Sequence, residues 1–242
     1  MDESIQTDAV VFDLFGTLVE FHVSQLHRLL AEMADSLGIP FELFLEHWSP
    51  AYAIAEISAS WTVEDQLRQI SSAFNLHPDP DVIALLGDRW RRFQRGLLVP
   101  KKQTLDTLQH LRVMGLKLGL LSNCPPDVHI MWPHSALAPL LDVTGFSSEM
   151  ALRKPDLQSY RFACRRLSVQ PHHALFMGDG GSQELSGAAA AGLRPVQLRA
   201  VNDDPVNDQG LDREQWHGPN ISRLGDLVLL IFGNQPGMIP NQ

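Results

Sequence analysis

The 242-residue sequence contains little cysteine and an excess of acidic over basic residues. Its two cysteines, Cys124 and Cys164, are too few for a disulfide framework or a cysteine-based zinc site, so free thiols in a reducing compartment are expected. Lys and Arg total 19 against 28 Asp and Glu, a net charge of -9. Nucleic acid and anionic lipid are therefore poor general partners.

Targeting and membrane signals are also missing. The first seven residues have no basic segment leading into an apolar one, so no signal peptide is expected. The apolar run at 227–232 is far shorter than the roughly 20 residues that a membrane-spanning helix needs. Because 44% of the residues are apolar, the chain can bury a sizeable core, and we expect a soluble, cytoplasmic protein.

The first part of the chain changes from a strand pattern to a helical one. Residues 9–12 are β-branched and aromatic and precede Asp13, which predicts a buried strand followed by a loop. Helical periodicity then predicts one helix ending near Leu37, one at about 41–57, one beginning at Thr62 and one at about 81–96. The aromatic residues of this all-helical stretch are expected to form its core.

After residue 100 helices alternate with strands. We predict helices at about 103–114, 157–167 and 183–191, and strands at 117–121, 143–146, 174–177 and 195–198. This alternation predicts an α/β fold, a doubly wound parallel sheet with helices on both faces. The polar segment 202–220 is expected to be a surface loop, 221–232 a last helix and the residues from 233 a tail.

Polar segments follow the predicted strands at the places where a parallel sheet gathers its ligand-binding side chains. They span residues 13–18, 122–123, 153–156 and 178–184. Two carboxylates can hold a hard cation such as Mg²⁺, and the cation together with a lysine can neutralise a phosphoryl group. An aspartate could then attack phosphorus as a nucleophile. The set therefore favours phosphoryl transfer.

The order, spacing and strand context of these segments resemble the haloacid dehalogenase superfamily of hydrolases, most of which are phosphatases. The first motif matches residues 13–18, the second Ser122, the third Lys154 with Pro155, and the fourth residues 178–184. The resemblance covers nearly the whole chain. It implies a Rossmann-like core at residues 1–19 and 99–242, with an inserted helical cap at about 20–98 that covers the site.

The resemblance also implies a metal side of the site. Asp13 would be the nucleophile and a ligand of Mg²⁺, and Asp179 would be a second ligand. The backbone carbonyl of Phe15 could still reach the metal, because that contact does not involve the side chain. Glu184 would orient metal-bound water.

A phosphate side is implied by the same motifs. Ser122 and Lys154 would hold the phosphoryl oxygens, with Asn123 next to them, and Lys154 would also offset the charge of the nucleophile. Gly16 and Thr17 would present backbone and hydroxyl groups to the anion. The implied partner is a small phosphorylated molecule.

Phe15 departs from the family pattern. Family phosphatases usually have an aspartate at this position, which protonates the leaving group, and its loss typically removes on the order of 10² to 10⁴ in rate. Phe15 is compatible with a phosphohydrolase that takes substrates with good leaving groups or borrows an acid from the cap, where Glu20 and His22 are candidates. Trp61, in the linker before the third cap helix, is a possible specificity residue.

Phe15 is also compatible with a dehalogenase or with a protein that has no activity. Family dehalogenases have Asp-x-Tyr-Gly-Thr at the first motif, close to residues 13–17 here, and Asn123 after Ser122 also resembles them. In that case Asp13 would attack carbon, without metal, although those enzymes lack the Gly178-Asp179 pattern. A non-enzymatic protein would keep a site that still binds Mg²⁺ and an anion.

Overall fold

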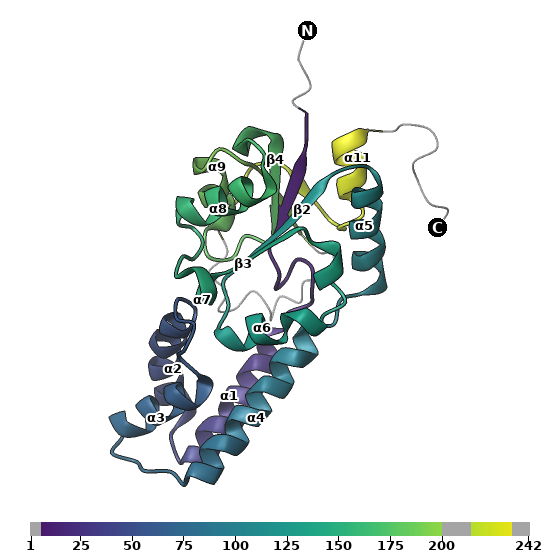
Figure 1. Cartoon of the computed structure of the whole chain (residues 1–242). Helices are drawn as coiled ribbons and strands as arrows, with labels where there is room; N and C mark the ends of the chain where they lie inside the picture. Colours follow the sequence, from purple (N-terminus) through teal and green to yellow (C-terminus); the bar gives the residue numbers. More distant parts are fainter. Residues whose placement is uncertain (1–5, 200–213, 234–242) are drawn as a thin grey trace.

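The computed structural model describes residues 6–199 and 214–233. It contains a parallel sheet with strand order β3-β2-β1-β4-β5-β6 and helices on both faces (Figure 1). The strands are β1 (Ala9–Phe12), β2 (Lys117–Ser122), β3 (Val143–Phe146), β4 (Ala174–Gly178), β5 (Arg194–Leu198) and β6 (Asn220–Ile221). The predicted α/β class and doubly wound sheet are confirmed.

Strand β1 lies in the middle of the sheet and is buried along its whole length. Val10 and Phe12 belong to an apolar cluster that includes α5 (Lys102–Val113) and α11 (Asp226–Phe232) on one face. Val11 packs in a second cluster with α8 (Leu157–Leu167) and α9 (Glu184–Ala190) on the other face. Both faces are covered, which explains why this strand has an apolar run without alternation.

The order of the strands creates a crevice at the carboxyl end of β1. The chain continues from β1 to β2 and β3 on one side of it, and returns to β4, β5 and β6 on the other. Phe12 is in register with Leu120 of β2 and Met177 of β4, so the residues that follow these strands emerge close together. Open α/β sheets bind their ligands at such a point.

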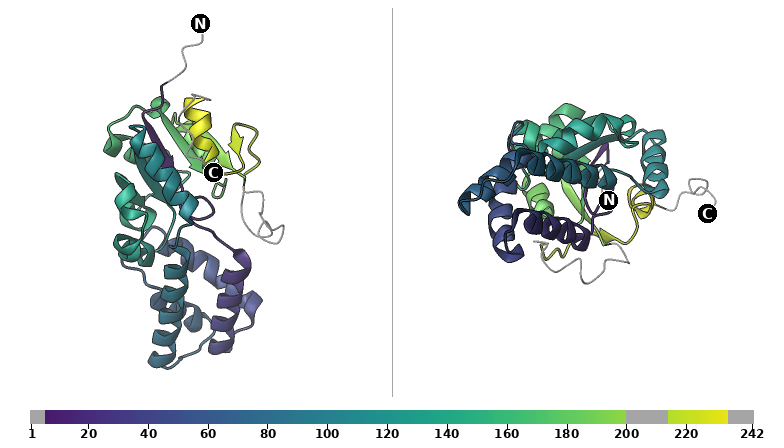
Figure 2. Two further views of the ribbon diagram at one scale, coloured as in Figure 1. Left: turned by 90° about the vertical axis from the view of Figure 1, so that its right-hand side faces the viewer. Right: turned by 90° about the horizontal axis from the view of Figure 1, so that it is seen from below.

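A group of helices lies beyond this carboxyl edge (Figure 2). It consists of α1 (Val23–Leu37), α2 (Phe41–Ala55), α3 (Val63–Ala73) and α4 (Pro80–Leu97). These helices share an apolar cluster that includes Trp48 and Trp90, as expected for their aromatic residues. Thr62 begins α3 with a capping box to Asp65. None of the helices within 6–199 and 214–233 has the length and apolar character required to cross a bilayer.

Several short elements were not predicted. Helix α6 (Pro126–Met131), helix α7 (Ser147–Met150) and the single-turn helices η1 (Trp132–His134), η2 (Ala138–Leu140) and η3 (Pro171–His173) show no helical period because each spans two turns or less. Strand β6 occupies residues that we assigned to a loop and a last helix, and α11 begins only at Asp226. Helix α2 ends at Ala55 instead of about 57. The predicted loop up to residue 213 and the tail from 234 lie outside the described residues.

Candidate active site

Five of the predicted site residues follow the strands at the crevice. Asp13 comes directly after β1, and Ser122 is the last residue of β2. Lys154 lies between α7 and α8, Asp179 follows β4, and Glu184 is the first residue of α9. Long stretches of sequence separate these residues, except for Asp179 and Glu184, and the sheet topology brings them to one place.

Lys154 is the centre of the site. Its Nζ donates hydrogen bonds to Asp13 Oδ1 and to Glu184 Oε2, each at 2.5 Å, and the side chain is buried. The Phe176 ring lies 5.5 Å from the same atom. Burial disfavours the charge on Lys154, but the two carboxylates outweigh it and hold its pKa above the ordinary value. The ammonium group therefore stays charged between two acids.

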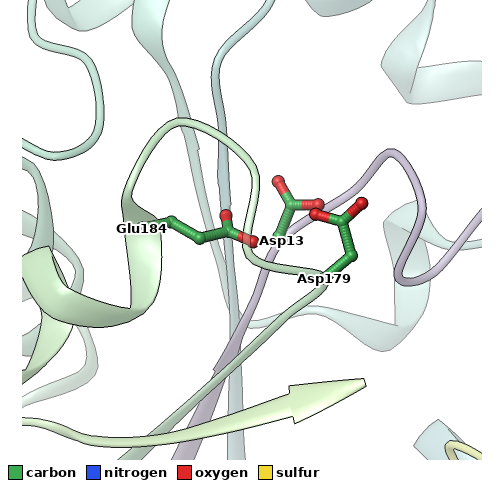
Figure 3. A group of neighbouring side chains, drawn as sticks. All are labelled: Asp13, Asp179 and Glu184. Carbon is green, nitrogen blue, oxygen red and sulfur yellow. The ribbon is translucent and has the colours of Figure 1, made fainter. Parts of the chain in front are cut away.

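Asp13, Asp179 and Glu184 form a compact group of carboxylates, with ligand atoms within 4.8 Å of one another. Figure 3 shows the carboxyl groups of Asp13 and Asp179 side by side, with the Glu184 side chain pointing toward them from α9. Burial raises the pKa of Asp13, Lys154 partly offsets this, and Asp179 adds to it. Burial also raises the pKa of Glu184. A cation at this point would relieve the repulsion between these acids.

Two glycines make this density of carboxylates possible. A Cβ at Gly178 would lie 2.1 Å from Glu184 Oε1, and a Cβ at Gly16 would lie 2.5 Å from Asp179 Oδ2. Gly16 also has a φ of +82°, a conformation that other residues rarely adopt. Any side chain at these positions would push an acid out of the group.

Two hydroxyl groups at the site are buried and unsatisfied. Among the residues that the structure describes, Thr17 Oγ1 has no hydrogen-bond partner. Ser122 Oγ has no oxygen or nitrogen partner, and it faces the thiol of Cys124. A buried polar group without a partner costs free energy, which a bound anion could recover. Neither residue is among those that line the cavity next to Asp13, so the anion-binding roles of both hydroxyls stay predictions.

Asn123 holds the main chain of Lys154. Its Nδ2 donates to the Lys154 carbonyl at 3.0 Å, and its Oδ1 accepts from the Lys154 amide at 2.8 Å. The side chain lines the same cavity as Asp13 but is occupied by these two bonds. The structure therefore gives Asn123 a positioning contact, and a direct contact with substrate stays a prediction.

Other residues that hold the site were missed from the sequence. Gln197 Nε2 donates to the Asp179 carbonyl at 3.0 Å, and Tyr160 Oη donates to the Glu184 carbonyl at 2.8 Å. Glu214 accepts hydrogen bonds from the Leu185 and Ser186 amides at the start of α9. A glutamine inside a buried strand was a usable signal for Gln197, whereas Glu214 lies in a polar segment with no distinguishing pattern.

A cavity of about 450 Å³ lies between these charged residues and helices α1, α2 and α4. Phe15 lines it, and so does Glu56, whose carboxylate is paired with Arg153 at 3.0 Å. Burial raises the pKa of Glu56, and the charges of Arg153 and Lys154 oppose this shift. The cavity thus has a charged side from the sheet and a helical side from the inserted helices.

Glu20 and Trp61 are not among the residues that line this cavity. The Glu20 carboxylate pairs with Lys101 on the surface, and hydrogen bonding to that lysine lowers the pKa of Glu20. A lowered pKa does not suit an acid that must carry a proton near neutral pH. The acid or specificity role of Glu20 and the specificity role of Trp61 stay predictions.

An open parallel sheet with buried carboxylates and a lysine at its switch point is typical of α/β enzymes that act on small ligands. A family model for haloacid dehalogenase-like hydrolases matches residues 7–192, and the chain belongs to this family. It is therefore a hydrolase, as the resemblance implied.

The chain has relatives that are named as dehalogenases and relatives that are named as phosphatases. The chain is 26% identical over 207 residues to (S)-2-haloacid dehalogenase 4A of Burkholderia cepacia, covering 81% of this chain and 85% of that protein. It is 30% identical over 196 residues to a pyrophosphatase of Bacillus pumilus, covering 78% and 82%. The solved L-2-haloacid dehalogenase of Xanthobacter autotrophicus has a TM-score of 0.66 at 20% identity, covering 95% and 100%, which supports the fold.

Proposed function

We propose that the chain is a Mg²⁺-dependent phosphohydrolase of a small phosphorylated metabolite and works through an aspartyl phosphate on Asp13. The observation that carries this proposal is the buried group of Asp13, Asp179 and Glu184 around Lys154. Carboxylate oxygens suit Mg²⁺, and a lysine next to the nucleophile suits a phosphoryl dianion.

The donor set fits the metal. Asp13 and Asp179 would hold Mg²⁺, with the Phe15 carbonyl as a further ligand, and the bound ion would neutralise charge on the phosphoryl group. Both Glu184 oxygens are already engaged, Oε1 by the Gly180 amide at 3.0 Å and Oε2 by Lys154. Glu184 therefore supports the site by orienting Lys154 and water, without binding the metal itself.

The chain's own residues then perform two displacements. An Asp13 oxygen attacks phosphorus, and the bond from phosphorus to the leaving oxygen breaks. Water next attacks phosphorus and releases inorganic phosphate, which restores the Asp13 carboxylate. Lys154 and the hydroxyls of Thr17 and Ser122 hold the phosphoryl oxygens throughout, with the Gly16 backbone beside them.

We also propose that residues 20–98 act as a cap over a core of residues 1–19 and 99–242. The helices α1, α2 and α4 supply one side of the cavity, and the core supplies the reacting groups. A cap in this position excludes water during attack and selects substrates by shape.

The test is phosphate release from acetyl phosphate, p-nitrophenyl phosphate and a sugar phosphate, with and without Mg²⁺. Activity that needs Mg²⁺, disappears in Asp13→Asn and falls steeply toward the sugar phosphate is expected, because Phe15 cannot protonate the leaving group. The absence of phosphate release from all three substrates would contradict the proposal.

A second candidate is a 2-haloacid dehalogenase. Phe15 stands where family dehalogenases have tyrosine, and the Burkholderia cepacia relative carries that name. Asp13 would then attack carbon and release halide. Halide release from 2-haloacids that persists in a chelator and disappears in Asp13→Asn would favour this candidate over the phosphohydrolase.

A further inference from the structure

The helical side of the cavity is aromatic. The rings that line it together with Asp13 are Phe15, Phe21, Trp48, Tyr52, Trp90 and Phe93. The Trp48 and Trp90 centroids are 5.1 Å apart, Tyr52 and Trp90 are 6.0 Å apart, and Phe15 and Phe21 are 5.9 Å apart. These separations are typical of favourable ring pairs. Trp48 and Trp90 are buried, so the ring surface left open to a ligand comes from the partly exposed rings, which are Phe15, Phe21, Tyr52 and Phe93.

The helical side of the cavity carries few charged side chains. Of the described residues between Phe15 and Leu97 that line the cavity, Glu56 is the one acidic or basic side chain other than histidine. The basic side chains of the lining, Arg153 and Lys154, are already paired with carboxylates. A second anionic group on the substrate would therefore meet rings and the Glu56 carboxylate, where desolvation is costly.

Phe15 affects both the surface of the cavity and the kind of leaving group that the site can accept. It occupies the position of the usual acid, so the leaving oxygen must depart without receiving a proton from that residue. A phenolic oxygen, with a pKa of about 10, is a far better leaving group than the oxygen of a simple alcohol. The substitution that removes the acid also adds a ring to the wall of the cavity.

We propose that the helical side binds an uncharged aromatic group and that the substrate is an aromatic compound phosphorylated on a weakly basic oxygen. This inference rests on the proposed phosphohydrolase function. The bond from Asp13 to phosphorus forms as the bond to the aromatic oxygen breaks, and that oxygen keeps the electron pair as phenolate or carboxylate. Water then releases inorganic phosphate and a proton.

Benzoyl phosphate and acetyl phosphate test the recognition of the ring separately from the chemistry. Their leaving carboxylates have nearly the same basicity, and the difference is a ring in place of a methyl group. Burial of the ring is expected to raise kcat/KM for benzoyl phosphate about 10- to 100-fold over acetyl phosphate. Phenylphosphonate should exceed methylphosphonate in affinity by a similar factor, measured by calorimetry with Mg²⁺.

Phe93→Ala should reduce both preferences by about tenfold because the ring of Phe93 lines the cavity. Leu85→Ala is the matched control on α4, since Leu85 is half exposed and does not line the cavity. If Phe93→Ala is poorly folded, Phe93→Leu keeps most of the apolar volume while it removes the ring, and a smaller reduction is expected.

Equal kcat/KM for the two acyl phosphates, with activity that still needs Asp13 and Mg²⁺, would overturn the aromatic inference and leave the phosphohydrolase intact. If neither acyl phosphate is hydrolysed, the phosphohydrolase proposal fails. In that case the affinities for phenylphosphonate and methylphosphonate test whether the cavity recognises a ring. Equal affinities for the two would also overturn the aromatic inference. An unchanged preference in folded Phe93 variants would also overturn it.

Discussion

The two sides of the cavity are built by different physical means. The sheet side places Asp13, Lys154 and Glu184 together through hydrogen bonds between charged, buried groups. The helical side holds Trp48 and Trp90 in an apolar cluster. The first arrangement depends on partners for every charge, and the second depends on packed volume. Bond breaking and substrate selection can therefore change independently, and substitutions on the two sides test this separation.

The largest expected effect is on the sheet side, in Lys154→Met. Loss of the ammonium group leaves buried carboxylates without their counter-charge, which should cost about 3–5 kcal/mol of unfolding free energy and abolish turnover. Lys101→Met is the control, because Lys101 pairs with Glu20 at the surface and should lose less than about 1 kcal/mol. Urea denaturation in the absence of Mg²⁺ measures both. Equal stability of wild type and Lys154→Met would show that Asp13 and Glu184 are not both charged in the wild type.

Phe15→Asp is expected to give the next largest change. An aspartate at this position can protonate the leaving oxygen, so hydrolysis of a sugar phosphate should rise by about 10² to 10⁴ in kcat. Phe21→Asp is the matched control, because Phe21 lines the same cavity and its ring lies 5.9 Å from that of Phe15. An equal gain in both variants would mean that any acid in the cavity suffices.

Gly178→Ala tests the close packing of the sheet side. The added methyl group would collide with Glu184 Oε1, and displacement of Glu184 should lower kcat/KM about 10- to 100-fold and raise the Mg²⁺ concentration needed for activity. Gly96→Ala, in open space on α4, should instead stabilise the helix by about 0.5–1 kcal/mol. Titration of activity against Mg²⁺ distinguishes the two variants. An unchanged titration in Gly178→Ala would refute the proposal that Glu184 supports the metal site.

The smallest expected effect is on the helical side. Thr62→Ala removes the capping box of α3 and should lower the unfolding free energy by about 1 kcal/mol with no change in kcat. Thr62→Ser keeps the hydroxyl and should stay close to wild type. A clear fall in kcat for Thr62→Ala would mean that the stability of the helices and the chemistry are coupled.

The long elements were predictable because burial leaves a period in the sequence. The apolar run of β1 and the helical period of α1 indicated their positions closely. Short elements such as α6 and β6 leave no period, since too few residues face the core. Pro50 inside α2 also shows that packing can outweigh a local propensity.

The grouping of Asp13, Lys154, Asp179 and Glu184 was predictable, because parallel strands bring their carboxyl ends to one edge. Its internal contacts were not predictable. The pairing of Asn123 with the Lys154 main chain depends on a fold that joins residues 31 positions apart. The apolar wall opposite Asp13 also could not be seen, since Trp48 and Trp90 contribute both to the helical core and to the cavity.

If the chain is the phosphohydrolase that we propose, the pairing of Lys154 with two carboxylates has a consequence for the release of product. A phosphate dianion must compete with Asp13 and Glu184 for the same ammonium group. We therefore expect a low ground-state affinity for inorganic phosphate, because Asp13 and Glu184 compete with it for Lys154. Once the product departs, Lys154 would return to its internal partners, and we expect such an enzyme to resist inhibition by the phosphate that accumulates around it.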